Sequence, residues 1–389
     1  MHLIFVAPEY PPDSGGVGVF FRGLGQSLVT KGHAVTVLGC RREAAAWDDG
    51  GVRVRMLPAT RLRGCGWLVN RLRLQRQIRR LAASEGLDLI EAPDWCGLSA
   101  GLRPPCPLVI RCHGSATYFG QVLHEPVTPG VRLAERLALR RATSIAAVSR
   151  FCADTTAALF WRRKTEQTTA HPALPDKIRV IYNGVDTTRF HTAREAEAEP
   201  GVILYFGTLV RKKGALDLPD VFNRVAAVCP HARLRIIGRD NPDRRLGTNS
   251  VWATLQTLFT PEARRRVEYL GPLPHEALQE EIRRAAVCVF PSYAEAFPLT
   301  WLEAMACGKP VAGYDLPWAR EAVGADAGLL SPPGDTAALA DTLLRLMADQ
   351  EARTALGTRA RQRVEACFSQ ERMLGDTLKW YAEVIKHKH

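Results

Sequence analysis

The most constraining feature of this chain is an alternation of short apolar runs with segments of helical periodicity, which fills nearly all of its 389 residues. Apolar runs of about four to eight residues, bounded by turn-forming residues, are typical of buried strands. When such strands alternate with helices, they indicate parallel sheets that helices cover on both faces. The candidate strands are HLIFVAP, HAVTVLGC, VRVRML, LDLIEAP, PLVIRCHG, SIAAVS and IRVIYNG in the first half, and GVILYFG, ARLRIIG, RVEYLG, AAVCVFPS, PVAGYD and AGLLSPPG in the second.

Between the two halves lies the polar segment DTTRFHTAREAEAEPG, residues 186–201, which has no apolar face and which we expect to be a linker. The sequence therefore predicts an α/β protein of two doubly wound domains, residues 1–186 and residues 187–370. Ligands of such sheets bind beyond the carboxyl ends of the strands. Two such domains that face each other would form a deep cleft. The last four residues, KHKH at 386–389, are expected to be the remnant of an expression tag.

Composition favours a protein of the cytoplasm. The chain is 46% hydrophobic and 24% charged, and it contains no apolar run long enough to cross a bilayer. Its N-terminus, MHLIFVAPEYPP, has no basic region ahead of the apolar run, so we expect a first strand and not a signal peptide. The ten cysteines form no C-x-x-C pair, which gives no sign of a zinc knuckle or a redox motif. Reduced thiols are expected.

The formal charge of +12 allows nucleic acid, an anionic membrane or a phosphate-rich small molecule as a partner. Residues 61–80, RLRGCGWLVNRLRLQRQIRR, contain seven arginines and no acid. A helical wheel places Leu68, Leu72, Leu74 and Ile78 on one side and Arg73, Arg76 and Arg80 on the other. This segment is either an outer helix of the domain or an interfacial helix on anionic lipid, and both hold if only the arginines contact lipid. No nucleic-acid motif is recognised, so nucleic acid is not expected as a partner.

A glycine cluster, PPDSGGVGVFFRGLG, follows the first strand and opens a helix. Gly16 and Gly18 fit the first two places of the dinucleotide motif G-x-G-x-x-G, but Phe21 occupies the third, where close packing needs glycine. A nicotinamide site is therefore not indicated. Gly15 and Gly16 either let the backbone approach an anion at the helix N-terminus or form a simple strand-to-helix turn.

Phosphate would have to be met by cationic side chains and helix N-termini, because neither a P-loop motif nor a D-x-D motif occurs. A bound metal ion or other cofactor is not expected. Arg211, Lys212 and Lys213 follow the first strand of the second domain, which places them at the carboxyl edge of its sheet. They are either phosphate ligands or a solvated turn.

Two carboxylates bracket an apolar run in EAFPLTWLE, residues 295–303. Pro298 suits the first position of a helix, and we expect that helix to continue from Leu299 to Ala306. Glu295 would then lie in the preceding loop and Glu303 inside the helix, while the backbone amides at the helix start offer an anion site. Carboxylates beside an anion site suggest a ligand that carries both hydroxyls and phosphate.

Two further positions stand at strand ends in the first domain. His113 ends the strand PLVIRCHG and is either a structural hydrogen-bonding residue or a substrate contact, with Gly114 beside it permitting a close approach. Asn183 and Gly184 in IYNGVD are turn formers, and a tight turn into the linker could be their whole role.

These residues carry a resemblance to a known family. The spacing from Glu295 to Glu303 resembles the E-x7-E motif of retaining glycosyltransferases of family 4. The segments GGVG, CHG, AVSRF, YNGVD, YFGTLVRKKG and PSYAEAFPLTWLEAMACGKPVAG appear in the family's order and span nearly the whole chain. The resemblance implies the GT-B fold, with two Rossmann-like domains that face a central cleft. The first domain would carry the acceptor side and the second the nucleotide sugar, while residues 371–385 would form a helix that returns to the first domain.

The resemblance also implies roles for single residues. Glu303 would hold the ribose hydroxyls of a nucleotide-diphosphate sugar, and Glu295 would contact the transferred sugar, with His113 near that sugar. The amides of Phe297, Leu299 and Thr300 would bind phosphate, and Arg211 and Lys213 would neutralise it. The family often places arginine directly after the glycine of FG. That position is Thr208 here, and whether Arg211 supplies the missing charge stays open.

The sequence thus predicts a cytoplasmic retaining glycosyltransferase that uses a UDP- or GDP-activated sugar and needs no metal. Its acceptor would be a glycan, a lipid-linked sugar or a small molecule, with peripheral contact to the inner face of an anionic membrane through residues 61–80. The alternatives are a nucleotide-sugar epimerase or hydrolase of the same fold and, from a different class, a basic nucleic-acid-binding α/β protein.

Overall fold

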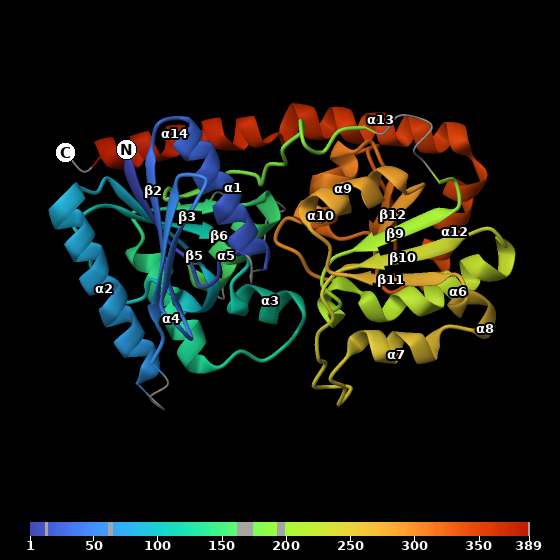
Figure 1. The fold of residues 1–389 in the computed structure, drawn as a ribbon, viewed down its shortest axis with the longest axis horizontal. Coiled ribbons are helices and arrows are strands. Elements are labelled where there is room, and N and C mark those ends of the chain that lie inside the picture. Colours follow the sequence, from blue (N-terminus) through green and yellow to red (C-terminus); the bar gives the residue numbers. More distant parts are fainter. Residues whose placement is uncertain (12–14, 61–64, 162–173, 193–198, 388–389) are drawn as a thin grey trace. The chain divides into compact units, whose positions relative to one another are not determined.

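The computed structural model describes residues 1–11, 15–60, 65–161, 174–192 and 199–387. The chain divides into two compact units (Figure 1). Unit 1 comprises Met1–Tyr182 and Met373–His389, and unit 2 comprises Asn183–Arg372. The expected tag remnant at 386–389 begins within a helix, because the last helix continues to Lys386, while residues 388–389 lie outside the described ranges.

Unit 1 is built on a sheet of eight strands in the order β3-β4-β2-β1-β5-β6-β7-β8. Every neighbouring pair is parallel except β3 with β4. The strands are β1 (His2–Val6), β2 (Ala34–Arg41), β3 (Ala45–Asp49), β4 (Val52–Pro58), β5 (Leu89–Pro93), β6 (Leu108–Cys112), β7 (Ser144–Ala147) and β8 (Ile178–Val180).

Apolar cores lie on both faces of this sheet, as expected for a doubly wound domain. One core joins β1 and β2 to α1 (Gly16–Thr30) and α14 (Gln370–Lys386), and it contains Phe5, Leu24 and Trp380. The other joins β1 and β5 to α2 (Gly66–Glu85), and it contains Ile4, Ile90 and Ile78. The helices are α1 (Gly16–Thr30), α2 (Gly66–Glu85), the 3-10 turn η1 (Trp95–Gly97), α3 (Ala116–Val122), α4 (Pro129–Arg141), α5 (Arg150–Phe160) and α14 (Gln370–Lys386).

The antiparallel strand β3 was not predicted from the sequence. It forms a hairpin with β4, in which Asp49 is paired with Val52. The two residues between them, Gly50 and Gly51, have φ values of 64° and 86°. Two-residue hairpin loops favour the type I′ turn, which needs positive φ at both central residues and therefore often contains glycine. The letters DDGG directly before VRVRML were thus a sequence signal for this hairpin.

A buried ion pair joins α14 to the sheet of unit 1. Arg111 on β6 donates from Nε to Oε1 of Glu91 on β5 at 2.7 Å, and both side chains are fully buried. From α14, Thr377 accepts a hydrogen bond from Arg111 Nη2 at 3.2 Å, and the Tyr381 hydroxyl donates to Glu91. Trp380 donates from its indole nitrogen to Ser144 Oγ at 2.9 Å. The C-terminal helix is therefore held by polar contacts inside the core as well as by apolar packing.

The arginine-rich helix α2 buries only part of the apolar side that the helical wheel predicted. Its buried residues are Leu74, Ile78 and Leu81, whereas Leu68 and Leu72 are exposed. Both leucines lie in the first two turns of the helix, and the helix lies over the core that contains Ile4 and Ile90 only from Leu74 onward. Arg61 and Arg63, at the start of the basic stretch, lie outside the described residues. Among the helices in the described ranges, none is both long enough and apolar enough to cross a membrane.

Unit 2 contains a six-stranded parallel sheet in the order β11-β10-β9-β12-β13-β14. The strands are β9 (Val202–Phe206), β10 (Arg233–Ile237), β11 (Val267–Gly271), β12 (Val287–Phe290), β13 (Val311–Tyr314) and β14 (Leu329–Ser331). The helices and 3-10 turns are η3 (Arg211–Lys213), η4 (Ala215–Asp217), α6 (Leu218–Val228), α7 (Val251–Leu258), α8 (Pro261–Arg264), α9 (His275–Arg284), α10 (Leu299–Ala306), α11 (Pro317–Val323), α12 (Thr336–Ala348) and α13 (Gln350–Cys367).

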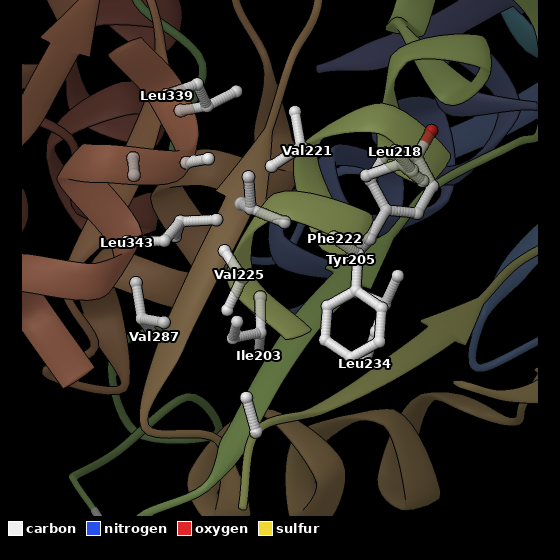
Figure 2. Packing of buried hydrophobic residues seen from close by; sticks show 14 of the residues in the cluster. Ile203, Tyr205, Leu218, Val221, Phe222, Val225, Leu234, Val287, Leu339 and Leu343 are labelled. Carbon is white, nitrogen blue, oxygen red and sulfur yellow. The ribbon is translucent and has the colours of Figure 1, made fainter. Parts of the chain in front are cut away.

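The core of unit 2 lies where α6 and α12 pack on one face of this sheet (Figure 2). Side chains of α6, such as Phe222 and Val225, meet strand residues such as Ile203, and Leu343 of α12 completes the layer. All of these side chains are at most 2% exposed. Their burial fixes the strands whose carboxyl ends carry the candidate site.

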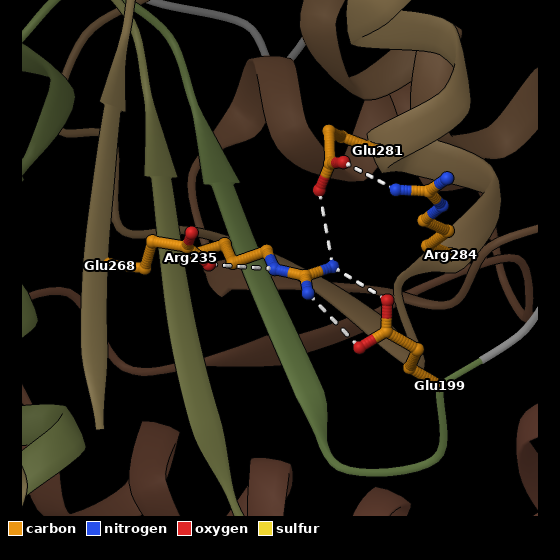
Figure 3. A network of polar contacts seen from close by, with 5 residues as sticks. All are labelled: Glu199, Arg235, Glu268, Glu281 and Arg284. Atoms are coloured by element: carbon orange, nitrogen blue, oxygen red, sulfur yellow. Dashed lines mark hydrogen bonds and ion pairs between the residues drawn. The ribbon is translucent and has the colours of Figure 1, made fainter.

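A network of ion pairs in unit 2 is centred on the side chain of Arg235 on β10 (Figure 3). Arg235 donates to both carboxylate oxygens of Glu199 at 2.9 and 3.0 Å, and it also pairs with Glu268 at 3.1 Å and Glu281 at 3.2 Å. These contacts connect β10, β11, α9 and the residues just before β9. Of the segment that we expected to be a linker, residues 186–192 and 199–201 belong to unit 2, and residues 193–198 lie outside the described ranges.

The described part of that segment is attached to unit 2 at Phe190, although Thr188, Arg189, His191 and Thr192 are exposed. Phe190 is buried, and its ring lies edge-on to that of His275 with centroids 5.3 Å apart. Arg361 of α13 donates to the carbonyl of Thr187 at 3.0 Å and to that of Phe190 at 2.5 Å. The buried Phe190 ring and the hydrogen bonds from Arg361 together attach this polar segment to unit 2.

Candidate active site

The candidate site of unit 2 lies where three neighbouring parallel strands end. β9 pairs with β10 on one side and with β12 on the other, so the loops that follow these strands share one edge of the sheet. The loop after β9 contains η3, the loop after β10 spans residues 238–250, and the loop after β12 leads into α10. The sequence placed Arg211, Lys213, Glu295 and Glu303 at this edge, and the structure brings all four to it.

The helix α10 begins one residue later than predicted. Pro298 has φ −80° and ψ 115°, which is extended backbone, so it is the N-cap residue and Leu299 is the first helical residue. In the first turn of a helix the N–H groups have no acceptor within the helix. The amides of Leu299 and Thr300 therefore point out of the helix start, where the helix dipole favours an anion.

Glu303 is a buried carboxylate in the second turn of α10, with 8% of the residue exposed. Within the described residues its side chain accepts no hydrogen bond and forms no ion pair. Burial raises the pKa of Glu303 to about 7, and the positive charge of Lys213 acts in the opposite direction. A buried carboxylate normally has donors that satisfy it. Glu303 is thus suited to accept hydrogen bonds from a bound molecule.

Glu295 stands in the loop before α10 and is held by Lys213. The Lys213 ammonium donates to Glu295 Oε1 at 2.7 Å, and the hydroxyl of Ser292 donates to the same oxygen at 3.4 Å. The side chains of Lys213 and Glu295 are 20% and 11% exposed, so this ion pair is largely shielded from water. Since Lys213 also influences Glu303, one cation serves both carboxylates of the motif.

Arg211 is likewise paired with a carboxylate. Its Nη2 lies 3.1 Å from Oδ2 of Asp243, whose side chain is 10% exposed. Asp243 is fixed in turn, because its Oδ1 accepts from the backbone amides of Arg245 at 2.9 Å and Leu246 at 3.2 Å. Thr208 stands three residues before the start of η3, and its carbonyl accepts a hydrogen bond from the Tyr205 hydroxyl at 3.2 Å, so it adds no charge to this edge.

The side chain of Asn183 contacts the loop before α10. This contact was not predicted from the sequence. Its Nδ2 donates to the carbonyl of Phe297 at 3.1 Å, and Asn183 is only 4% exposed. The Phe297 ring is buried against Phe368 with centroids 5.1 Å apart. Asn183 thereby helps to fix the backbone from which α10 starts, so its role exceeds that of the tight turn proposed from sequence. An asparagine after a strand is compatible with both roles, and only the fold distinguishes them.

His113 belongs to unit 1, where it follows β6. Its ring lies 4.6 Å from that of Phe20, and Nε2 is buried without a hydrogen-bond partner in the described residues. Burial, with a smaller contribution from Arg111, lowers the pKa of His113 to about 3, so the imidazole is neutral. Its backbone amide donates to Asp94 Oδ1 at 3.0 Å. Burial raises the pKa of Asp94 to about 7.

The sequence analysis did not single out Asp94, although it directly follows the predicted strand LDLIEAP. Beside it, Glu135 of α4 is fully buried and accepts from the amides of Cys96, Ala116 and Thr117 at 2.8–3.0 Å. These two carboxylates organise the loops at the carboxyl ends of β5 and β6.

Gly15 and Gly16 open α1 in unit 1, Gly15 as the N-cap residue and Gly16 as the first helical residue. A side chain at Gly15 would come within 2.9 Å of a carboxylate oxygen of Glu9. The start of α1 is therefore already next to a negative charge. Residues 12–14, which complete the glycine cluster, lie outside the described ranges. In the ranges that the structure describes, no three His, Cys, Asp or Glu side chains are grouped so that they could hold a metal ion.

Comparison with known proteins places these motifs in a family. Residues 186–363 match the family described as Glycosyl transferases group 1, and residues 14–189 match Glycosyltransferase Family 4. D-inositol 3-phosphate glycosyltransferase 1 of Catenulispora acidiphila is 30% identical over 305 residues, which cover 72% of this chain and 69% of that protein. The chain belongs to the family 4 (group 1) glycosyltransferases.

Other similarities extend over nearly the whole glycosyltransferase chain. A glycogen synthase of Mycobacterium tuberculosis is 27% identical over 417 residues, covering 98% of this chain and 94% of the relative. The structure of Anabaena HepE in complex with UDP and glucose matches with a TM-score of 0.74 at 19% identity, covering 98% of this chain and all of the other. The GT-B fold predicted from the sequence is thereby confirmed.

Proposed function

We propose that this glycosyltransferase moves a sugar, with retention of anomeric configuration, from a UDP- or GDP-sugar to a sugar, glycan, lipid-linked or small-molecule acceptor. The observation that carries the proposal is the carboxylate of Glu303, which is buried, accepts no hydrogen bond from the described residues and stands on the helix whose N-terminal amides can bind an anion. Vicinal ribose hydroxyls are donors that would satisfy this carboxylate, and a diphosphate is the matching anion.

The phosphate groups would be bound by the amides of Phe297, Leu299 and Thr300 and by the cations Lys213 and Arg211. Each cation has an acidic partner, Glu295 or Asp243. A bound diphosphate would compete for the same donors, and two phosphates offer more acceptor oxygens than one carboxylate. This competition would release Glu295 from Lys213 at the moment when the donor sugar arrives beside it.

The chemistry would then proceed on one face of the sugar. The bond between the anomeric carbon and the diphosphate oxygen breaks, the acceptor oxygen forms its bond to the same carbon from the same side, and the acceptor proton passes to the leaving phosphate. The amides of α10 and Lys213 would stabilise the charge that develops on that phosphate. The carboxylate of Glu295 would favour the oxocarbenium-like transition state.

For the residues of unit 1, the proposal rests on the family motifs in which they stand. His113 would contact the transferred sugar as a neutral imidazole, which fits its lowered pKa. Gly15 and Gly16 would let the backbone approach the donor phosphate. Transfer without a bound metal ion, and a cytoplasmic location, stay predictions from the sequence.

The experiment is a panel of nucleotide sugars and nucleoside diphosphates tested for thermal stabilisation, since a molecule that binds the native state raises its melting temperature. Donor consumption with and without added acceptors is then followed by product analysis. We expect UDP- or GDP-sugars to stabilise the protein and to yield a glycoside. An isomerised nucleotide sugar as product would indicate an epimerase, and free sugar regardless of acceptor would indicate a hydrolase. Absence of stabilisation by every nucleotide would overturn the proposal.

A further inference from the structure

The largest group of exposed apolar side chains in the described chain lies on unit 1, on α2, η1 and α4. Ten large apolar residues of the described ranges are exposed, and six of them lie on these elements: Trp67 (59%), Leu68 (44%), Leu72 (49%), Trp95 (41%), Leu133 (58%) and Leu137 (45%). Exposed apolar residues that occur singly need no explanation, whereas a concentration of them marks an interaction surface.

The three elements adjoin one another within unit 1. Arg71 of α2 donates to the carbonyl of Gly97 in η1 at 2.6 Å, and its guanidinium lies 5.0 Å from the centre of the Trp67 ring. Gly97 packs so closely on α4 that a side chain at this position would lie 2.3 Å from the backbone of Ala134. The first half of α2 and the middle of α4 therefore flank η1. We call the exposed side of these three elements the α2–α4 face.

Arginines accompany the apolar residues on this face. On α4, the exposed positions are Arg132, Leu133, Arg136, Leu137, Arg140 and Arg141. On α2, Arg76, Arg79 and Arg80 are exposed, while Arg73 is partly buried with a hydrogen bond to the carbonyl of Pro58. Thus Arg79, and not Arg73, belongs to the outward set.

The acidic residues of the two helices do not offset this charge. α2 contains Glu85, which pairs with Arg53 at 2.6 Å, and α4 contains Glu135, which is fully buried and bonded to backbone amides. The charge that α2 and α4 present to solvent is therefore strongly positive, and it is interleaved with leucine and tryptophan.

We propose that the α2–α4 face binds an anionic lipid bilayer, with the two tryptophans and the leucines entering the interfacial region and the arginines contacting lipid headgroups. Amphipathic helices that lie in the membrane interface combine exposed leucine and tryptophan with arginine, and tryptophan favours the headgroup level. Nucleic acid would use the arginines but leave the leucines without a matching surface. A second copy of the chain would bring arginine against arginine. An anionic bilayer offers both a negatively charged surface for the arginines and an apolar region for the leucines and tryptophans.

This surface is a partner site additional to the proposed donor site, and it does not depend on that site. If the protein does not bind anionic membranes, the test of nucleotide binding to the donor site of unit 2 is unaffected. If it does bind them, a lipid-linked acceptor is favoured among the acceptor classes proposed above.

The test is co-sedimentation of the full chain with vesicles that contain about one third anionic phosphatidylglycerol, compared with pure phosphatidylcholine, over a series of salt concentrations. Each arginine near an anionic surface contributes roughly fivefold to the partition coefficient, so Arg76→Gln, Arg79→Gln and Arg80→Gln together should weaken binding roughly a hundredfold. Leu68→Ser with Leu72→Ser should weaken binding at least tenfold and should leave a residual that is more sensitive to salt.

Matched controls come from unit 2. Arg224, Arg265 and Arg284 are at least 48% exposed, and their replacement with Gln removes the same charge. Val228 and Leu258 are exposed apolar residues, and their replacement with Ser matches the leucine changes. Both control sets should bind vesicles like the parent, and all variants should keep the parent's circular dichroism and its response to nucleotide.

Tryptophan fluorescence provides a second readout. The parent should show a blue shift on binding and quenching by lipids brominated near the headgroup, and both should fall in Trp67→Phe and Trp95→Phe. No binding to anionic vesicles at low salt would overturn the proposal. So would equal losses in the controls, which would mean attraction by net charge alone. Unchanged vesicle binding in the variants, with loss of RNA binding or of self-association instead, would assign the face to one of those partners.

Discussion

Replacement of Glu303 by Gln should stabilise the protein while it weakens nucleotide binding. The change keeps the size of the side chain and removes its ionisation. Because burial holds the pKa of Glu303 at about 7, the folded protein retains a proton that the unfolded chain, with a carboxyl pKa near 4.5, has already lost at neutral pH. Wild-type stability should therefore fall as pH rises from about 4.5 to about 7, and the loss should be complete above that range.

The size of this effect follows from the two pKa values. Their difference of about 2.5 pH units corresponds to about 3 kcal/mol of unfolding free energy above pH 7. The Gln variant lacks this dependence, so its advantage over the parent should grow as pH rises from about 4.5 to about 7 and then stay constant. For a domain of this size, about 3 kcal/mol corresponds to roughly 5–10 °C in Tm.

The assay is a pair of thermal melts of parent and variant at matched pH values. Taking the difference cancels other groups that titrate in the same range, such as Asp94. Nucleoside diphosphate affinity is then measured at pH 8 by calorimetry. Hydrogen bonds to a charged group are worth roughly 1.5–3 kcal/mol, so the variant should bind roughly ten- to a hundredfold more weakly.

A Tm difference that does not change with pH would show that Glu303 ionises normally in the folded protein. An unchanged affinity for the nucleoside diphosphate would refute its role as the hydroxyl ligand. Stabilisation together with loss of binding is the combination that marks a residue kept for function at the expense of stability.

Three further changes test other parts of the account. Glu295→Gln should lower the transfer rate more than it lowers nucleotide affinity, and a product formed at the parental rate would leave Glu295 a structural role only. Arg211→Ala combined with Lys213→Ala should weaken binding of the nucleoside diphosphate much more than that of the nucleoside, whereas equal losses, measured by calorimetry, would mean that neither cation contacts phosphate. Arg111→Met leaves Glu91 buried without its cation and should cost about 3–5 kcal/mol in denaturant unfolding. Adding Glu91→Gln should restore most of that loss, and a fully additive double variant would contradict the pairing.

Much of the fold could be read from the sequence because strand and helix periodicities act locally. Every predicted strand of both halves is present, since long apolar runs such as GVILYF leave few alternatives to a buried parallel strand. The strand β3 was missed because its letters AAWDD are only partly apolar, and its pairing depends on the two-glycine turn that follows. For α2 the helical wheel placed Leu74 and Ile78 correctly but Leu68 and Leu72 wrongly, because a wheel treats a helix as packed along its whole length, whereas α2 lies on the core only from Leu74 onward.

The residues of the candidate site could be predicted where their position directly after a strand determines the sheet edge at which they lie. Residues that follow neighbouring parallel strands meet at one edge, which brings Lys213 to Glu295 across 82 positions of sequence. Their pairing partners were not predictable, because the bond of Asp243 to Arg211 and that of Asn183 to Phe297 depend on loop conformations that no periodicity encodes. The buried Arg111–Glu91 pair had a weak signal, namely opposite charges inside two adjacent apolar strands.

The most direct test of the central claim is a binding cycle that pairs one protein change with one ligand change. The nucleoside diphosphate that stabilises the protein best is compared with its 2′,3′-dideoxy analogue, on the parent and on Glu303→Gln. If the Glu303 carboxylate accepts the ribose hydroxyls, the parent should prefer the natural nucleotide by roughly tenfold or more, and the variant should lose most of this preference. The same preference in both proteins would mean that the hydroxyls are bound elsewhere and would contradict the assignment of this site to a nucleotide sugar.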